Sequence, residues 1–283
     1  GYARRGDRTL RRRPPPRWGR KPPAAQIFSG PPKRPDSRPA APAYLRGMAG
    51  AFLAERRREP ELMDDPGLDP AELEAALATL ARVHRLSGTA ARLAAGIERR
   101  FRAPGRTLTV ADLACGGGEL TRALARALAR RGVRARVTGF DQSPVAVARA
   151  RGLAAGPGLA LDFAVRDLVG QGLPEGWDVF VSALFLHHLD EAALAGLLRA
   201  VAERAALGCV FHDLDRTRLG YFLASVGPRL LGRSRVAIVD GQLSVRAALR
   251  PAEVLELAHA NGLAGARVER CFPERWQLVW SRP

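Results

Sequence analysis

The sequence predicts an α/β protein with a doubly wound, mostly parallel, seven-stranded sheet. From residue 107 onward, short apolar runs alternate with helical stretches, which is typical of strand–helix–strand units. Three consecutive glycines follow the first run, as expected where a strand turns tightly into a helix. The last two runs, 265–272 and 276–281, lie close enough in sequence to form an antiparallel hairpin at one edge of the sheet.

Composition divides the chain into three regions. Residues 1–47 hold 10 of the 21 prolines and 13 Lys/Arg against two Asp, so they contribute +11 of the net charge of +17. They show no helical or strand period, and we expect them to be disordered. Residues 48–106 should form an N-terminal helical cap and residues 107–283 the α/β domain. The part after residue 47 is only mildly basic, which argues against a specific nucleic-acid partner.

Two interpretations of the basic arm remain open. It could contact nucleic acid or an anionic membrane, because clustered arginines neutralise phosphates. Alternatively, it is a linker, or sequence translated from upstream of a natural start at Met48. We favour the second interpretation because the chain begins at Gly1 and because sequence typical of a folded region starts just after Met48.

The cap region contains two predicted helices. The first begins at Asp69, which can serve as N-cap, with Pro70 at the first helical position and Glu72 three residues after the cap. Apolar residues then recur at helical spacing, namely Leu73, Leu77, Leu80 and Val83. The second helix, roughly 89–101, follows a break at Ser87 and Gly88.

The α/β domain contains seven strand-like runs. In order they are "LTVADLA", "ARVTGFD", "LALDFAVRD", "WDVFVSA", "LGCVFHD", "GARVERCF" and "WQLVWS". The connection after the fifth run, 213–249, is too long for a simple loop, so we expect a helical insertion there.

The glycine turn and a strand-end carboxylate indicate a nucleoside ligand. In open α/β sheets the ligand lies beyond the carboxyl ends of the strands, at a helix N-terminus with free N–H groups. A side chain on Gly116, Gly117 or Gly118 would fill the ligand's space. Asp141, at the tip of the second run, can accept both hydroxyls of a ribose.

The turn meets the dinucleotide-binding pattern GxGxxG only in part, because Thr121 replaces the third glycine. A nicotinamide oxidoreductase remains an alternative, since it would also use a glycine turn and an acid, but it would lack the signature of Asp112 and Asp167. The order of Asp112, the glycine cluster, Asp141 and Asp167 instead resembles the class I S-adenosylmethionine-dependent methyltransferases, over roughly residues 107–283. The resemblance implies a Rossmann-like fold. Ala114 stands where this family usually has its first glycine.

The resemblance implies S-adenosyl-L-methionine as the cofactor and assigns residues around it. Asp112 would lie near its amino-acid end, Asp141 would hold the ribose, and Ser182 would close the site at the end of the fourth run. The other implied positions are Ala114, Cys115, Gly116, Gly117 and Gly118 along the backbone path, Gln142 beside the adenine, and Asp167 with Leu168 at the adenine amino group.

The segment "LFLHHLDE" after the fourth run resembles one in small-molecule O-methyltransferases, in which a histidine acts as base. His187 would take the acceptor proton, whereas His188 would point elsewhere if the segment is helical, and we expect it to be structural. Alternatively, both histidines only cap the helix that opens near Asp190. The same His-His-Leu also occurs in related enzymes that methylate carbon on quinones.

"SALF" replaces the Asn/Asp-Pro-Pro-Tyr motif of nucleic-acid and protein-amide methyltransferases, which disfavours these two acceptor classes.

The insertion offers a candidate acceptor cap. Tyr221, Phe222 and Leu223 lie near several arginines and would suit a phenolic or lipophilic molecule; a surface helix pair packed on the core is an equal alternative. The segments "HHLD" and "DGQLSVR" resemble bacterial methyltransferases of polyketide or quinone-like phenolics, which implies O-methylation of a small molecule in secondary metabolism. C-methylation of a quinone-like ring and a non-catalytic nucleoside-binding protein are the alternatives.

Cysteine spacing and hydropathy indicate in which cellular environment the protein works. Cys115, Cys209 and Cys271 are widely spaced, without a CxxC pair or a nearby histidine at metal-ligand spacing, so we expect neither a metal site nor disulfides. A reducing cytoplasm fits this pattern. No apolar run approaches the length of a transmembrane helix, so at most a peripheral membrane contact is expected.

We predict that residues 1–47 contribute neither to folding nor to cofactor binding. A chain starting at Met48 should melt within a few degrees of the full chain by calorimetry, because the arm has too little apolar surface to pack on a core. A large loss of stability would contradict this. Salt-sensitive RNA binding by the full chain alone would support the basic-arm interpretation instead.

Overall fold

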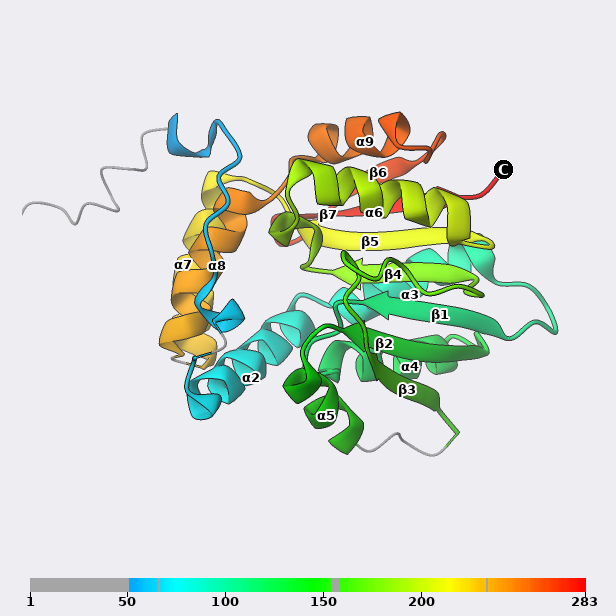
Figure 1. The fold of residues 1–283 in the computed structure, drawn as a ribbon, viewed down its shortest axis with the longest axis horizontal. Helices are drawn as coiled ribbons and strands as arrows, with labels where there is room; N and C mark the ends of the chain where they lie inside the picture. The colour runs from blue at the N-terminus through cyan, green and yellow to red at the C-terminus, as the bar shows by residue number, and fades with distance from the viewer. Residues whose placement is uncertain (1–50, 66, 154–157, 233) are drawn as a thin grey trace, which may run out of the picture. The chain divides into compact units, whose positions relative to one another are not determined.

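The computed structural model describes residues 51–65, 67–153, 158–232 and 234–283, so the arm predicted at 1–47 lies outside the described residues. Those residues form one seven-stranded sheet in the order β3-β2-β1-β4-β5-β7-β6 (Figure 1). Its strands are β1 (Leu108–Leu113), β2 (Ala135–Asp141), β3 (Ala160–Val165), β4 (Val179–Ala183), β5 (Gly208–Leu214), β6 (Arg267–Cys271) and β7 (Arg275–Ser281). The first five are parallel, and β7 runs antiparallel to β5 and β6. The predicted fold class is therefore confirmed.

The order of the strands reverses between β1 and β4. From β1 the chain adds β2 and β3 on one side, then returns to add β4 and β5 on the other. Ligands of open α/β sheets bind at such a switch point, outside the carboxyl ends of the strands. Leu113 of β1 is paired with Ser182 of β4, so the segments that follow these two strands leave the sheet side by side.

Helices cover both faces of the sheet and bury a core on each. On one face lie α3 (Thr89–Phe101), α4 (Glu119–Arg130) and α5 (Pro144–Gly152), over strand residues such as Val110 and Val137. On the other face lie α6 (Glu191–Arg204) and α9 (Pro251–Ala260), over Leu113, Phe180 and Phe211. Successive strand residues alternate between the two cores because the side-chain period of a strand is two.

Three further helices gather at the carboxyl ends of the parallel strands (Figure 1). The predicted insertion forms a hairpin of α7 (Arg218–Leu231) and α8 (Arg235–Ala247), and α2 (Pro70–Leu86) packs against both. Asp69 accepts a hydrogen bond from the N–H of Ala71, as predicted for the N-cap of α2. In the described ranges, no helix is both long and apolar enough to cross a membrane.

The chain before α2 runs along α8, and we call residues 56–64 the strap. The described residues also contain three short 3-10 helices, which are η1 (Ala51–Leu53) before the strap, η2 (Leu62–Asp64) at its end, and η3 (Leu186–His188) after β4. η3 and η2 both contact α8, so α8 brings the strap to the segment that follows β4.

A buried carboxyl on β1 fixes the entry to α4. Asp112 is only 2% exposed, and it accepts a hydrogen bond of 2.7 Å from the hydroxyl of Thr121. Thr121 occupies the place of the third glycine of GxGxxG, so this bond explains why a hydroxyl residue stands there. Burial raises the pKa of Asp112 from 3.8 to about 7; the Thr121 bond opposes the shift, and the charge of Asp141 adds to it.

We predict that Asp112→Asn changes the pH dependence of stability. Between pH values of about 4 and 7, Asp112 ionises in the unfolded chain but stays protonated in the fold. The native state therefore binds more protons, and the carboxyl destabilises the fold increasingly as pH rises through this window. The melting temperature of the variant, relative to the natural protein, should rise from pH 4 to pH 7 and then level off. A difference that stays constant would contradict the raised pKa.

Candidate active site

The turn after β1 adopts a left-handed backbone at three positions. Gly116 has a φ of 52° and Gly118 a φ of 80°, values that glycine tolerates readily. Ala114 has a φ of 58°, so the alanine at the usual first-glycine position occupies a conformation that L-residues avoid. The backbone is thus curled tightly between β1 and α4.

The three glycines are required for different reasons, which corrects the expectation that each keeps space for a ligand. A Cβ on Gly117 would lie 2.7 Å from Arg149 Nε and Glu119 Oε2, and one on Gly118 would lie 2.6 Å from the Cβ of Ala150. Gly118 is therefore required by the packing against α5 and β3, whereas a side chain at Gly117 would displace the flexible side chains of Arg149 and Glu119. Only Gly116 faces open space, with Leu77 of α2 as its nearest neighbour at 4.0 Å.

Asp141 links the glycine turn to the start of α5. Its carboxylate accepts the N–H of Gly116 at 2.8 Å and the N–H of Ser143 at 2.9 Å. A carboxylate offers about four acceptor positions, so two remain for a ligand. Gln142, beside it, is exposed.

The other predicted cofactor residues have local partners. Asp167 is exposed and accepts the N–H groups of Val169 and Gly170, whereas Leu168 is buried. The side chain of Cys115 packs over Gly139 of β2. The buried hydroxyl of Ser182 donates to the Leu113 carbonyl at 3.1 Å, tying β4 to the end of β1.

The segment after β4 presents a buried histidine paired with a carboxylate. The chain leaves β4 through Leu184, which has a left-handed φ of 56°, and places His187 in η3. His187 Nδ1 lies 2.7 Å from Asp213 Oδ1 at the end of β5. Both side chains are about 2% exposed. Burial alone would raise the pKa of Asp213, but the charge and hydrogen bond of His187 keep it below its usual value.

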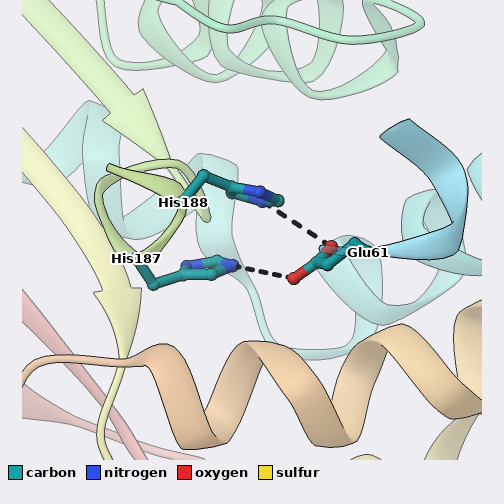
Figure 2. A group of neighbouring side chains, drawn as sticks. All are labelled: Glu61, His187 and His188. Atoms are coloured by element: carbon teal, nitrogen blue, oxygen red, sulfur yellow. Dashed lines mark ion pairs between the residues drawn. The ribbon is translucent and has the colours of Figure 1, made fainter. Parts of the chain in front are cut away.

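His188 does not point elsewhere, which corrects the prediction for this side chain. Its ring lies over that of His187, with centroids 4.4 Å apart and planes tilted by 32°. Both rings face the carboxylate of Glu61 in the strap (Figure 2). Each His Nε2 lies 3.8 Å from a different oxygen of Glu61. Both imidazoles therefore lie on the same side of η3, next to one carboxylate.

The charge near His188 is also set by the strap. Burial lowers the pKa of His188, but the neighbouring carboxylates of Asp64 and Glu61 outweigh this effect and raise it overall. Asp64 Oδ2 lies 3.6 Å from His188 Nδ1.

α8 holds the strap in place through the segment "DGQLSVR", whose role the sequence left open. Asp240 accepts the N–H groups of Leu62 and Met63 at 2.8 and 3.0 Å. The Ser244 hydroxyl lies 2.6 Å from Glu61 Oε1. From the strap itself, Arg56 donates to the carbonyls of His187, Leu189 and Ala247, which joins the strap, η3 and α8.

Sequence reasoning missed Glu61 and Asp213. Asp213 is the last residue of the fifth strand-like run. Its position at a strand end could have identified it as a candidate site residue. Glu61 lies in the charged stretch "ERRREPELMDD", which has no periodicity. No local signal distinguishes Glu61 from its neighbours there.

The sequence of this chain is similar to those of known methyltransferases. Residues 110–206 match a family model described as a methyltransferase domain. Two curated relatives are ubiquinone biosynthesis O-methyltransferases, from Pseudoalteromonas translucida (28% identical, 54% of this chain and 61% of the relative) and Sodalis glossinidius (31%, 52% and 56%). The chain thus spans less than two thirds of the length of these relatives.

Solved structures share the fold. The plantazolicin methyltransferase BpumL with SAH has a TM-score of 0.57 at 14% identity, over 76% of this chain and 91% of that one. Human N-acetylserotonin methyltransferase with SAM has a TM-score of 0.53 at 17% identity, over 75% and 56%. The family-model match therefore identifies residues 110–206 as similar to a methyltransferase domain, and the fold around them is shared with solved methyltransferases.

Proposed function

We propose that this protein transfers the methyl group of S-adenosyl-L-methionine to a hydroxyl of a small phenolic or lipophilic molecule. The observation that carries the proposal is the adjacency of two strand ends. The turn after β1 leaves room at Gly116, and the segment after β4 presents the buried His187–Asp213 pair. Because Leu113 and Ser182 are paired neighbours, a donor at the turn and an acceptor at His187 would meet.

The residues at the turn fit the proposed cofactor. The space above Gly116 would admit a ligand backbone, which a Cβ at this position would obstruct. The two acceptor positions left on Asp141 suit the two hydroxyls of a ribose, and Asp112 would lie near the amino-acid end. S-adenosyl-L-methionine, when bound, supplies an electrophilic methyl group. Gln142, Asp167, Leu168 and Ser182 complete the proposed cofactor site.

His187 would hold the proton that the acceptor hydroxyl loses. With Nδ1–H hydrogen-bonded to Asp213, the lone pair on Nε2 is free to accept that proton. Asp213 fixes the tautomer and orientation of the ring and stabilises the imidazolium that forms. Asp213 is thus a positioning residue, and His187 touches the reacting hydroxyl.

The acceptor class follows from the surroundings and the relatives. α7 and α8 stand at the strand ends, and Phe222 and Leu223 of α7 are exposed apolar side chains. Two relatives are named for O-methylation in ubiquinone biosynthesis, which supports a phenolic acceptor. C-methylation of a quinone-like ring is the second candidate; there the acceptor's own phenolate would activate the carbon, and the ring C–H proton would be lost after the methyl group is transferred. We keep a cytoplasmic location within the proposal, since all three cysteines are free thiols.

Asp141→Ala should weaken binding of S-adenosyl-L-methionine at least tenfold by calorimetry. The loss follows because hydrogen bonds to charged groups contribute about 1.5–3 kcal/mol each. Asp162→Ala, which removes an exposed carboxylate on neighbouring β3, is the matched control and should bind normally. Equal affinity in the Asp141 variant would contradict the ribose assignment.

His187→Ala should lower turnover at least a hundredfold while cofactor affinity stays nearly unchanged, since a general base contributes roughly 10²–10⁴-fold. Asp213→Asn should lower turnover in the same direction by favouring the wrong tautomer. His259→Ala on α9 is the control and should keep normal turnover. A His187 variant that retains more than a tenth of natural turnover would favour proximity alone, or a carbon acceptor.

A further inference from the structure

Glu61, His187 and His188 form a group of three side chains that we call the His–Glu cluster (Figure 2). One ligand atom from each residue lies within 4.8 Å of the other two. Glu61 is 8% exposed and His187 2%. The three residues come from two distant segments, the strap and η3, and this separation is why the sequence spacing indicated no metal site.

The facing polar atoms of the His–Glu cluster do not form hydrogen bonds with one another. Each Glu61 oxygen lies 3.8 Å from a His Nε2, which is too long for a hydrogen bond. Within the described residues, neither Nε2 has another hydrogen-bond partner. The Nε2 atoms of His187 and His188 and the carboxylate of Glu61 therefore face one another, and no hydrogen bond joins them.

The outer contacts orient these atoms as in a metal site. His187 Nδ1 is hydrogen-bonded to Asp213, which directs the Nε2 lone pair toward Glu61. This is the carboxylate–histidine arrangement that supports metal-ligating histidines. Ser244 donates to Glu61 Oε1 in the same supporting way. Arg56 and Arg58 direct their guanidinium groups to main-chain carbonyls of η3.

We propose that the His–Glu cluster binds a single divalent transition-metal ion of the zinc class, with one coordination position left open. Two histidines and one glutamate form a known three-ligand zinc set. Zinc binds these atoms at about 2.0–2.2 Å, so tetrahedral ligand atoms lie roughly 3.3–3.6 Å apart. The 3.8 Å separations would need only a small contraction. The two imidazoles favour zinc-class ions over magnesium or calcium.

The bound ion would compete with the base role of His187. This consequence rests on the proposed function, because the ion and the acceptor proton use the same Nε2 lone pair. The metal-free protein should therefore be the active form, and zinc should suppress methyl transfer without displacing S-adenosyl-L-methionine. Faster turnover in the zinc-bound protein would overturn this consequence.

Binding is tested on the full chain after treatment with a chelator, without cofactor or acceptor. Calorimetric titration with Zn²⁺ should show one ion per chain, and Co²⁺ should give the visible absorption of a low-coordinate nitrogen and oxygen site. Glu61→Gln and His188→Gln should each weaken Zn²⁺ binding at least tenfold. Asp213→Asn keeps all three ligands and should weaken it about 10–100-fold.

Two matched variants serve as controls. Glu59→Gln removes a more exposed strap carboxylate that pairs with Arg246, and His259→Gln removes a histidine remote from the cluster. Both should bind Zn²⁺ as the natural protein does. The absence of saturable binding, or binding that survives both Glu61→Gln and His188→Gln, would overturn the proposal. Since calorimetry with S-adenosyl-L-methionine is a separate measurement, failure of the metal site and failure of the cofactor site are distinguishable.

Discussion

Strained backbone at two neighbouring strand ends sets the geometry on which the candidate site depends. Ala114 follows β1 and Leu184 follows β4, and both have a left-handed φ. Such a conformation costs on the order of 1–3 kcal/mol for a residue with a side chain. In the described residues, the third non-glycine example is Glu274, in the β6–β7 turn. The strain at β1 and β4 thus coincides with the switch point, where it directs one segment to the glycine turn and the other to η3.

The second half of the site depends on contacts that are distant in sequence. Asp240 and Ser244 of α8 fix the strap, and the strap carries Glu61 to the two histidines. The helical hairpin after β5 is therefore more than a cover for an acceptor. It determines which carboxylate faces η3, and so it links the insertion to the chemistry of His187.

Local patterns predicted the sheet, the N-cap at Asp69 and the helix at 89–101, because periodicity and capping are encoded within a few neighbouring residues. They also located the glycine turn. They did not separate Gly116 from Gly118, since the contacts that exclude a side chain at Gly118 come from Ala150 of α5 and Phe163 of β3. The direction of His188 depends on Glu61, which lies in an aperiodic stretch and meets the ring only in the folded chain.

The central claim is that donor and acceptor meet between the ends of β1 and β4. The most direct measurement is a crystal structure of the full chain with S-adenosylhomocysteine. Our account predicts the ribose on Asp141, the backbone of the ligand against Gly116, and the sulfur opening toward a vacant space beside His187. A ligand bound away from Asp141, or a sulfur screened from His187 by protein, would contradict it.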